Sequence, residues 1–212
     1  FSGATRPNMQ AYYKDQFGIE GEEAIIAKWK SEKKKNKNTQ MELAVTALLY
    51  KVLHKNNFIF RTNPYDDYIN GGDTIIIDKE TGSVVCAFDE VHEGGSGDRT
   101  LEKQNKISKI AHKGGARLRF GLVMENGKLK PSKLENLPIF YLGLNTEELN
   151  SLMENMEYDL NKEPSHQEMI IFKKLIDSVQ AQFSLLEEEN LPEPVTKRLN
   201  KFRETLVNLG QY

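Results

Sequence analysis

The sequence is poor in cysteine and has no long apolar run. Cys86 is the single cysteine among 212 residues, so a disulfide within the chain and a zinc site made of several thiolates are both excluded. No apolar run reaches roughly 18 residues, the length that a membrane-spanning helix requires, and no signal-peptide core stands at the N-terminus. These absences predict a cytoplasmic protein of a reducing, intracellular compartment, with no membrane among its partners.

The sequence also lacks an excess of charge of one sign and several common catalytic motifs. The formal net charge is −2, so no overall basic field indicates nucleic-acid binding, and any anion-binding surface must be local. The segment "GGDTII" lacks the GK[ST] element of a P-loop, and no GxSxG nucleophile elbow occurs. The four histidines are too scattered for a zinc motif that is local in sequence.

The residues that are present are typical of a folded globular protein. Hydrophobic residues make up 38% and charged residues 28% of the chain, and its length suffices for one domain with a sizeable core. We expect residues 1–38 to form an N-terminal helix and basic linker, residues 39–144 a core, and residues 145–212 a helical extension. The basic stretch Lys28–Asn38 is either a solvated linker or an arm that contacts phosphates, and both interpretations stay open.

The expected secondary structure mixes helices and strands. A helix begins at a cap at Asn38 or Thr39, with Glu42 placed as a capping-box glutamate, and runs to about Lys55. We then expect strands at 57–63, 114–125 and 137–144, a hairpin over 71–93 with its turn at 79–82, and a helix at 99–112. This order predicts an α/β fold, with a mixed central sheet flanked by helices on both faces and followed by the helical extension.

Apolar residues beyond Asn145 recur at alternating spacings of three and four, which predicts helices with one apolar side. The segment "NLPEP" separates two such stripes. The first consists of Met169, Phe172, Ile176, Val179, Phe183 and Leu186, and the second of Val195, Leu199, Phe202, Leu206 and Leu209. Two helices of this kind fold back as a hairpin or pair with another copy, so a homodimer through them is the expected assembly.

The hairpin carries acids at its open end. With the turn at 79–82, Ile77 faces Val84 and Asp73 faces Phe88, and residues two apart share a face. Asp73 therefore shares a face with Glu90 and His92, and a one-residue slip or a bulge would substitute Asp89 for Glu90.

Two carboxylates this close repel each other unless a proton or a cation lies between them. Oxygen ligands suit hard divalent cations, so Asp73 and Glu90 are candidate ligands of Mg²⁺ or Mn²⁺. A metal held this way can bind a phosphodiester oxygen and lower the pKa of an attacking water, and His92 can orient or deprotonate that water or act as a third ligand. The simpler alternative is that acids and a histidine at strand ends face water.

With these residues the sequence resembles the PD-(D/E)XK superfamily, the restriction-endonuclease-like nucleases, over Thr39–Leu144. That family has a helix, a three-stranded meander, a second helix and another strand in its core. "GGD", with Asp73, matches the family's first acid, and "EVH", with Glu90 and His92, matches its acid-x-lysine motif. The resemblance implies three further site residues, which are Glu42 on the first helix as a metal ligand and Lys103 and Gln104 on the second helix near the phosphate.

The sequence departs from the family pattern in having His92 where the motif has lysine. Lysine carries a fixed charge near neutral pH, whereas an unperturbed histidine has a pKa of about 6.5. Two functions follow. One is a metal-dependent endonuclease or exonuclease, a hydrolase acting on DNA or RNA, in which the loop Gly94–Arg99 or Lys103 steadies the phosphate and a basic arm at Lys30–Lys37 adds affinity. The other is a catalytically impaired nuclease-fold module that binds nucleic acid or a protein partner. A third, purely structural possibility is an oligomerisation protein built on the C-terminal helices.

Overall fold

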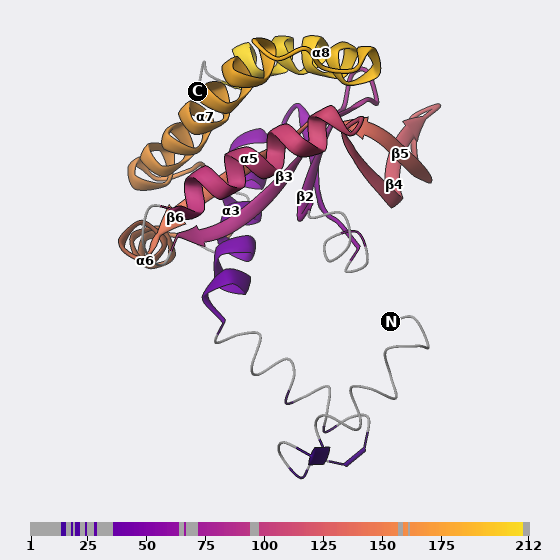
Figure 1. Ribbon diagram of the computed structural model, residues 1–212. Coiled ribbons are helices and arrows are strands. Elements are labelled where there is room, and N and C mark those ends of the chain that lie inside the picture. The colour runs from indigo at the N-terminus through magenta and orange to yellow at the C-terminus, as the bar shows by residue number, and fades with distance from the viewer. Residues whose placement is uncertain are drawn as a thin grey trace. The chain divides into compact units, whose positions relative to one another are not determined.

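The structure is a computed structural model of the chain (Figure 1). It describes residues 36–63, 66, 72–93, 98–156, 159, 160 and 162–209, with isolated residues between 14 and 28, and only the backbone at 85, 98–101, 103, 104, 208 and 209. The chain divides into two compact units, Phe1–Gln40 and Met41–Tyr212, of which the second holds both sheets. Within the described residues no helix has the combination of length and apolar character that a bilayer crossing needs.

The elements follow one another as a helix, a three-stranded meander, a helix, three more strands and three helices. Their bounds are α3 Lys37–Leu53, β1 Asn57–Arg61, β2 Thr74–Asp78, β3 Val84–Glu93, α5 Asp98–His112, β4 Ala116–Glu125, β5 Lys128–Leu137, β6 Ile139–Asn145, α6 Thr146–Asn155, α7 His166–Glu187 and α8 Glu193–Leu209. The main sheet has the order β1-β2-β3-β6, and β4 and β5 form a second sheet of two strands. Because β1, β2 and β3 are antiparallel and β6 is parallel to β3, the expectation of a mixed sheet is confirmed.

Helices cover both faces of the main sheet, as expected. The hydroxyl of Thr46 on α3 lies 3.2 Å from that of Thr74 on β2, and Thr74 shares its face with its cross-strand partner Phe88. Lys106 on α5 instead reaches Asp89 of β3, with 3.2 Å between Nζ and Oδ2. Since alternate residues of a strand point to opposite faces, α3 and α5 lie on opposite sides of β3.

Helix α3 begins earlier than the sequence predicts. The side chain of Asn36 accepts hydrogen bonds from the backbone N–H groups of Asn38 at 2.8 Å and Thr39 at 3.4 Å, so Asn36 is the cap. The prediction of a cap at Asn38 or Thr39 is therefore wrong, and so is the placement of Glu42 in a capping box. Glu42 does not cap the helix and instead faces the sheet, where it pairs with Arg61 of β1.

The hairpin of β2 and β3 contains a bulge that shifts its register. Ile77 pairs with Val84 as predicted, but Ile76 pairs with Cys86 and Thr74 with Phe88. Val85 is thus the extra residue, and the predicted pairing of Asp73 with Phe88 is wrong by one residue. A bulge bends the strand and strengthens its twist, and one inserted residue reverses which side chains share a face.

The two C-terminal stripes are buried against the sheet and against each other. All of their residues are buried except Met169, which is half-buried, and Leu209, whose side chain lies outside the described part. Phe202 of α8 stacks on Phe140 of β6, with ring centroids 4.7 Å apart, and meets the edge of Phe183 of α7. The apolar surface of both stripes is therefore buried within one chain. The expected homodimer stays a prediction, but it is no longer needed to bury this surface.

Helix α7 also closes the outer edge of β6. The side-chain amide of Gln182 accepts from the Tyr141 N–H at 2.7 Å and donates to the Tyr141 carbonyl at 2.8 Å, as a neighbouring strand would. At the other end of α7, Glu168 accepts two hydrogen bonds from Lys51 of α3, at 2.7 and 2.9 Å, and both side chains are fully buried. Glu168 belongs to the capping box of α7 as well. The helical extension is thus anchored to the core by buried polar contacts.

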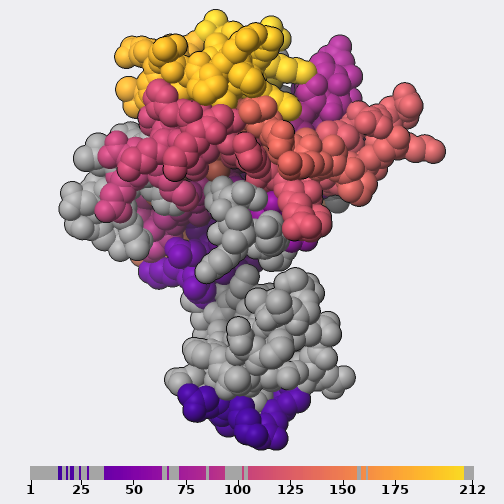
Figure 2. Space-filling model, turned by 45° about the vertical axis from the view of Figure 1, so that its right-hand side comes forward, coloured from indigo at the N-terminus to yellow at the C-terminus, as the bar shows by residue number. Residues whose placement is uncertain are grey.

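Strand β5 is absent from the sequence-based expectation. It pairs with β4 through a turn at Asn126 and Gly127, both with positive φ, and this Asn-Gly pair is a strong hairpin signal. Figures 1 and 2 show the β4–β5 hairpin extending past the main sheet. The buried carboxylate of Asp66 accepts from the N–H groups of Arg119 and Phe120, both at 2.8 Å, and so attaches the β1–β2 connection to β4.

The buried pair of Lys51 and Glu168 generates a stability prediction. Lys51→Met should lower the free energy of unfolding by about 3–5 kcal/mol, because it leaves the Glu168 carboxylate buried without its counter-charge. Urea denaturation gives the value. The double variant Lys51→Met/Glu168→Gln should recover part of the loss, since the unpaired charge is gone and an acceptor for the α7 cap is kept.

The matched control is Lys55→Met. Lys55 pairs with Glu163 on the surface, where both side chains are exposed, so its loss should cost less than about 1 kcal/mol. Equal losses for the Lys51 and Lys55 variants would contradict the anchoring role of the buried pair.

Candidate functional site

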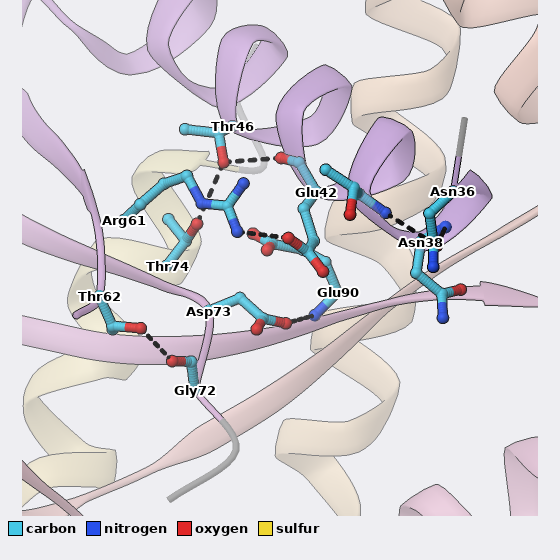
Figure 3. A network of polar contacts seen from close by, with 11 residues as sticks. Asn36, Asn38, Glu42, Thr46, Arg61, Thr62, Gly72, Asp73, Thr74 and Glu90 are labelled. Carbon is cyan, nitrogen blue, oxygen red and sulfur yellow. Dashed lines mark hydrogen bonds and ion pairs between the residues drawn. The ribbon is translucent and has the colours of Figure 1, made fainter. Parts of the chain in front are cut away.

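Four charged side chains converge between α3 and the main sheet (Figure 3). Glu42 comes from α3, Arg61 from the end of β1, Asp73 from the residue before β2, and Glu90 from β3. The meander brings them together, because Arg61 pairs with Thr74 and Thr74 pairs with Phe88, two residues before Glu90. We call Glu42, Arg61, Asp73 and Glu90 the acid cluster.

Asp73 is tied to β3 by its backbone and its side chain. Its N–H donates to the Phe88 carbonyl at 2.7 Å, and its Oδ2 accepts from the Glu90 N–H at 2.7 Å. The carboxylate thus takes the place of a backbone carbonyl where the ladder of β2 and β3 ends. Asp73 lies beside the backbone of Glu90, but the pairing of Asp73 with Phe88, from which the shared face of the two acids was predicted, is absent.

Glu90 is the least satisfied member of the acid cluster. Only 3% of the residue is exposed, and neither carboxylate oxygen has a hydrogen-bond partner of good geometry among the described residues. Burial raises the pKa of Glu90 well above 4.5, and the charge of Asp73 raises it further. The nearby Thr74 hydroxyl and the charge of Arg61 lower it, but they do not offset the burial. Burial therefore favours the protonated form of the Glu90 carboxyl, and a nearby cation would favour the ionised form.

Arg61 is the cation of the cluster, and sequence reasoning missed it. Its Nη2 forms an ion pair with Glu42 Oε2. Burial works to lower the pKa of Arg61, but the hydrogen bond and charge of Glu42, with the charges of Glu90 and Asp73, raise it overall. The only available signal was its position at the end of a strand next to an acid-bearing hairpin. That position does not distinguish it from a surface arginine.

Of the three acids in the cluster, two have carboxylate oxygens suited to bind a hard divalent cation. Among the described residues, no three Asp, Glu, His or Cys side chains are close enough together to hold a metal ion. The Asp73 carboxylate bonds to the backbone N–H of Glu90, its charge acts on the Glu90 carboxyl, and that carboxyl lacks a hydrogen-bond partner of good geometry among the described residues. Mg²⁺ in proteins is commonly bound by one or two carboxylates and completed by water and phosphate. Asp73 and Glu90 therefore fit such an ion, whereas Glu42 is engaged by Arg61.

The neighbours of Glu90 on β3 point to other partners. Asp89, the alternative that a bulge would have introduced, pairs with Lys106 on the α5 face. The bulge is present, yet Glu90 and not Asp89 is the acid whose backbone N–H bonds to Asp73 and whose carboxyl feels its charge. His92 is buried, and its Nε2 lies 3.0 Å from the Thr146 hydroxyl at the start of α6. His92 shares the face of Glu90, about 6.6 Å further along the strand, and its role as base stays a prediction.

Several predicted site residues lie outside what the structure describes. Lys103 and Gln104 belong to α5 by their backbone, but their side chains are not described. Most of the loop Gly94–Arg99 and of the basic arm Lys30–Lys37 is also outside the described residues. Their proposed contacts with phosphate stay predictions.

Comparisons with known proteins give no relative. No protein-family model, no curated protein and no solved structure matches the chain. The assignment of a function therefore depends on the geometry of the acid cluster and on the order of the elements.

The raised pKa of Glu90 predicts how stability depends on pH. The folded state binds the Glu90 proton more tightly than the unfolded state does. The stability that this proton contributes is therefore fully present below about pH 4.5 and is lost as the pH rises toward the folded pKa. Within that window the loss is up to about 1.4 kcal/mol for each pH unit. Glu90→Gln cannot ionise and should therefore be more stable than the wild type, by a margin that grows with pH.

Urea denaturation in metal-free buffer between about pH 5 and pH 8 measures this margin. Asp89→Asn is the matched control, because Asp89 is the preceding residue of the strand but points to the other face. The stability of Asp89→Asn relative to the wild type should not increase with pH. A margin for Glu90→Gln that stays constant across the range would contradict the raised pKa.

Proposed function

We propose that this chain is a metal-dependent nuclease that hydrolyses phosphodiester bonds in DNA, with Asp73 and Glu90 as the ligands of Mg²⁺ or Mn²⁺. The observation that carries the proposal is the buried Glu90 carboxyl, which lacks a hydrogen-bond partner of good geometry among the described residues and belongs to a residue whose backbone N–H bonds to Asp73. Buried polar groups are nearly always satisfied, and exceptions in native structures often mark a missing ion or a functional role. A divalent cation is the simplest partner for two adjacent carboxylates.

The order and pairing of the elements support the proposal. Helix α3, the meander β1-β2-β3, helix α5 and strand β6 follow the order of the restriction-endonuclease-like core. The β4–β5 hairpin is inserted between the second helix and the last strand of that order. Asp73 stands at the start of β2 and Glu90 on β3, the positions of the two acids in the family pattern. Fold alone does not determine activity, so this similarity adds to the site and does not replace it.

The chain's own residues would divide the work of hydrolysis. A divalent cation at Asp73 and Glu90 would polarise the phosphodiester and lower the pKa of a bound water. The Glu90 N–H fixes the Asp73 carboxylate, and the Thr74 hydroxyl lies near the Glu90 carboxyl. His92, oriented by Thr146, is the proposed acceptor of the proton from the attacking water.

The β4–β5 hairpin supports nucleic acid as the substrate. Its outer positions are exposed and largely basic, and they comprise Arg117, Arg119, Lys128, Lys130 and Lys133. Two of these lysines are paired, with Glu125 and Glu135, so the hairpin keeps a positive balance although the whole chain has a net charge of −2. Such a local basic surface provides affinity for phosphates that does not depend on sequence. RNA carries the same phosphates and is the comparison substrate.

A second candidate is a catalytically impaired module that binds nucleic acid or a protein through the same fold. The observation that favours it is His92, which replaces the motif lysine and contacts Thr146. A second observation favours the impaired module. Among the described residues, no three acidic, histidine or cysteine side chains lie close enough together to bind one metal ion. Cleavage assays distinguish the two candidates.

The first test of the proposal is cleavage of supercoiled, linear and branched DNA, and of RNA, in Mg²⁺ and in Mn²⁺. The wild type should cut DNA, and Asp73→Ala should lose both cleavage and Mn²⁺ binding, because it removes one of two ligands. Calorimetric titration with Mn²⁺ measures the binding.

Asp89→Asn serves as the control for the loss of an acid from the hairpin, and it should retain both properties. Cleavage by Asp73→Ala at the wild-type rate would disprove the assigned metal site. Binding of DNA by the wild type without cleavage of any substrate would favour the impaired module.

The second test concerns His92. If it is the general base, His92→Ala should reduce cleavage on the order of 10²-fold or more, whereas His92→Lys, which restores the motif residue, should keep or increase it. Both variants should bind Mn²⁺ as the wild type does. A His92→Ala variant with an unchanged cleavage rate would rule out this role.

A further inference from the structure

Arg61 places a fixed positive charge within the acid cluster. Its guanidinium pairs with Glu42, and its charge acts on Glu90. Its pairing partner in the sheet is Thr74, which links it to the strand that follows Asp73. Figure 3 shows the side chain reaching from β1 across the cluster toward α3. An arginine at this point is held by the sheet on one side and by a helix glutamate on the other.

The pair with Glu42 leaves part of the guanidinium accessible. About a third of the Arg61 side chain, 32%, is exposed, compared with 18% for Glu42. Glu42 accepts its hydrogen bond from Nη2, and a guanidinium has five N–H donors in one plane. That geometry allows an arginine to bind a carboxylate on one side and a phosphate on another.

The charges in the cluster indicate what this arginine is for. Three ionised carboxylates would repel an approaching phosphate, and a divalent cation at Asp73 and Glu90 together with Arg61 would balance them. The position where the family pattern has a lysine holds His92, whose ring contacts Thr146. Among the described residues, a positive side chain that acts on Glu90 comes from β1.

We infer that Arg61 binds the scissile phosphate of the nucleic acid, and that Glu42 is the positioning residue that orients Arg61 and is not a ligand of the metal. This inference rests on the proposed nuclease function, and it changes the role that the resemblance implies for Glu42. Arg61 supplies the fixed charge beside the metal site, and its pairing with Glu42 sets the direction of the remaining donors before substrate arrives.

The first experiment measures DNA binding without cleavage, in Ca²⁺ and in EDTA, over a series of salt concentrations. The probe is a short double-stranded DNA. Arg61→Gln should weaken binding on the order of 10-fold, as expected for a charge-assisted hydrogen bond, and should lower the salt slope by about one, as expected for one lost phosphate contact. Arg61→Lys and Glu42→Gln should weaken binding but keep the slope, because the positive charge remains.

Lys106→Gln is the matched control, since Lys106 forms the equivalent ion pair with Asp89 on the opposite face of the sheet. Its salt slope should equal that of the wild type. An unchanged slope for Arg61→Gln would overturn the inference. Because Arg61→Lys keeps the charge that Glu42 requires, it tests the contact even if Arg61→Gln fails to fold.

The second experiment measures Mn²⁺ affinity by calorimetry. Glu42→Gln and Arg61→Gln should bind Mn²⁺ at least as tightly as the wild type, whereas Asp73→Asn should bind it at least 10-fold more weakly. If Glu42→Gln loses Mn²⁺ as Asp73→Asn does, Glu42 is a ligand and the inference fails while the nuclease function stands. If the wild type neither binds Mn²⁺ nor cuts DNA, the nuclease function fails, and the salt slopes in EDTA still decide whether Arg61 contacts phosphate.

Discussion

The structure is organised around a carboxyl group that its surroundings do not satisfy. Glu90 is buried on β3, an inner strand of the main sheet, and its oxygens have no hydrogen-bond partner of good geometry among the described residues. A group of this kind costs free energy, so a fold retains it only where something else is gained. We propose that a cation site is what is gained, because Glu90 lies beside Asp73 and within reach of the Arg61 charge, and adjacent carboxylates attract a cation.

Polar contacts elsewhere in the unit join the elements that carry the acid cluster to the rest of the core. Thr46 and Thr74 join α3 to β2, and the buried pair of Lys51 and Glu168 joins the same helix to α7. Gln182 bonds to the outer edge of β6, the strand that neighbours β3. Each contact is polar and satisfied, so together they specify one packing of the helices on the sheet. The acid cluster is thereby built on regular elements, which hold functional groups more accurately than loops do.

The sequence predicted the order of most elements, because alternation and turn residues are local signals. It also placed Asp73 near Glu90, but through a register that the structure does not have. It did not predict the bulge at Val85, since an inserted residue leaves the apolar pattern of a doubly buried hairpin unchanged. Strand β5 was missed although Asn126 and Gly127 mark its turn, because its exposed, lysine-rich residues lack a clear alternation.

The partners of Glu42 and His92 also could not be predicted, because each depends on contacts between residues far apart in the sequence. Glu42 meets Arg61 across 19 positions, and His92 meets Thr146 across 54. A sequence motif predicts which residue type stands on which element, but it does not predict which distant side chain that residue contacts. This is why the resemblance suggested Glu42 as a metal ligand, whereas the structure pairs it with an arginine.

The most direct measurement is a crystal structure of the wild type grown with Mn²⁺, in which anomalous scattering locates the ion. The account predicts one strong peak bound by the carboxylates of Asp73 and Glu90, with the ion pair of Arg61 and Glu42 intact. A peak bound by Glu42 after Arg61 has moved away would contradict the role given to that pair. The absence of a peak at Asp73 and Glu90, at Mn²⁺ concentrations that saturate ordinary carboxylate sites, would contradict the central claim.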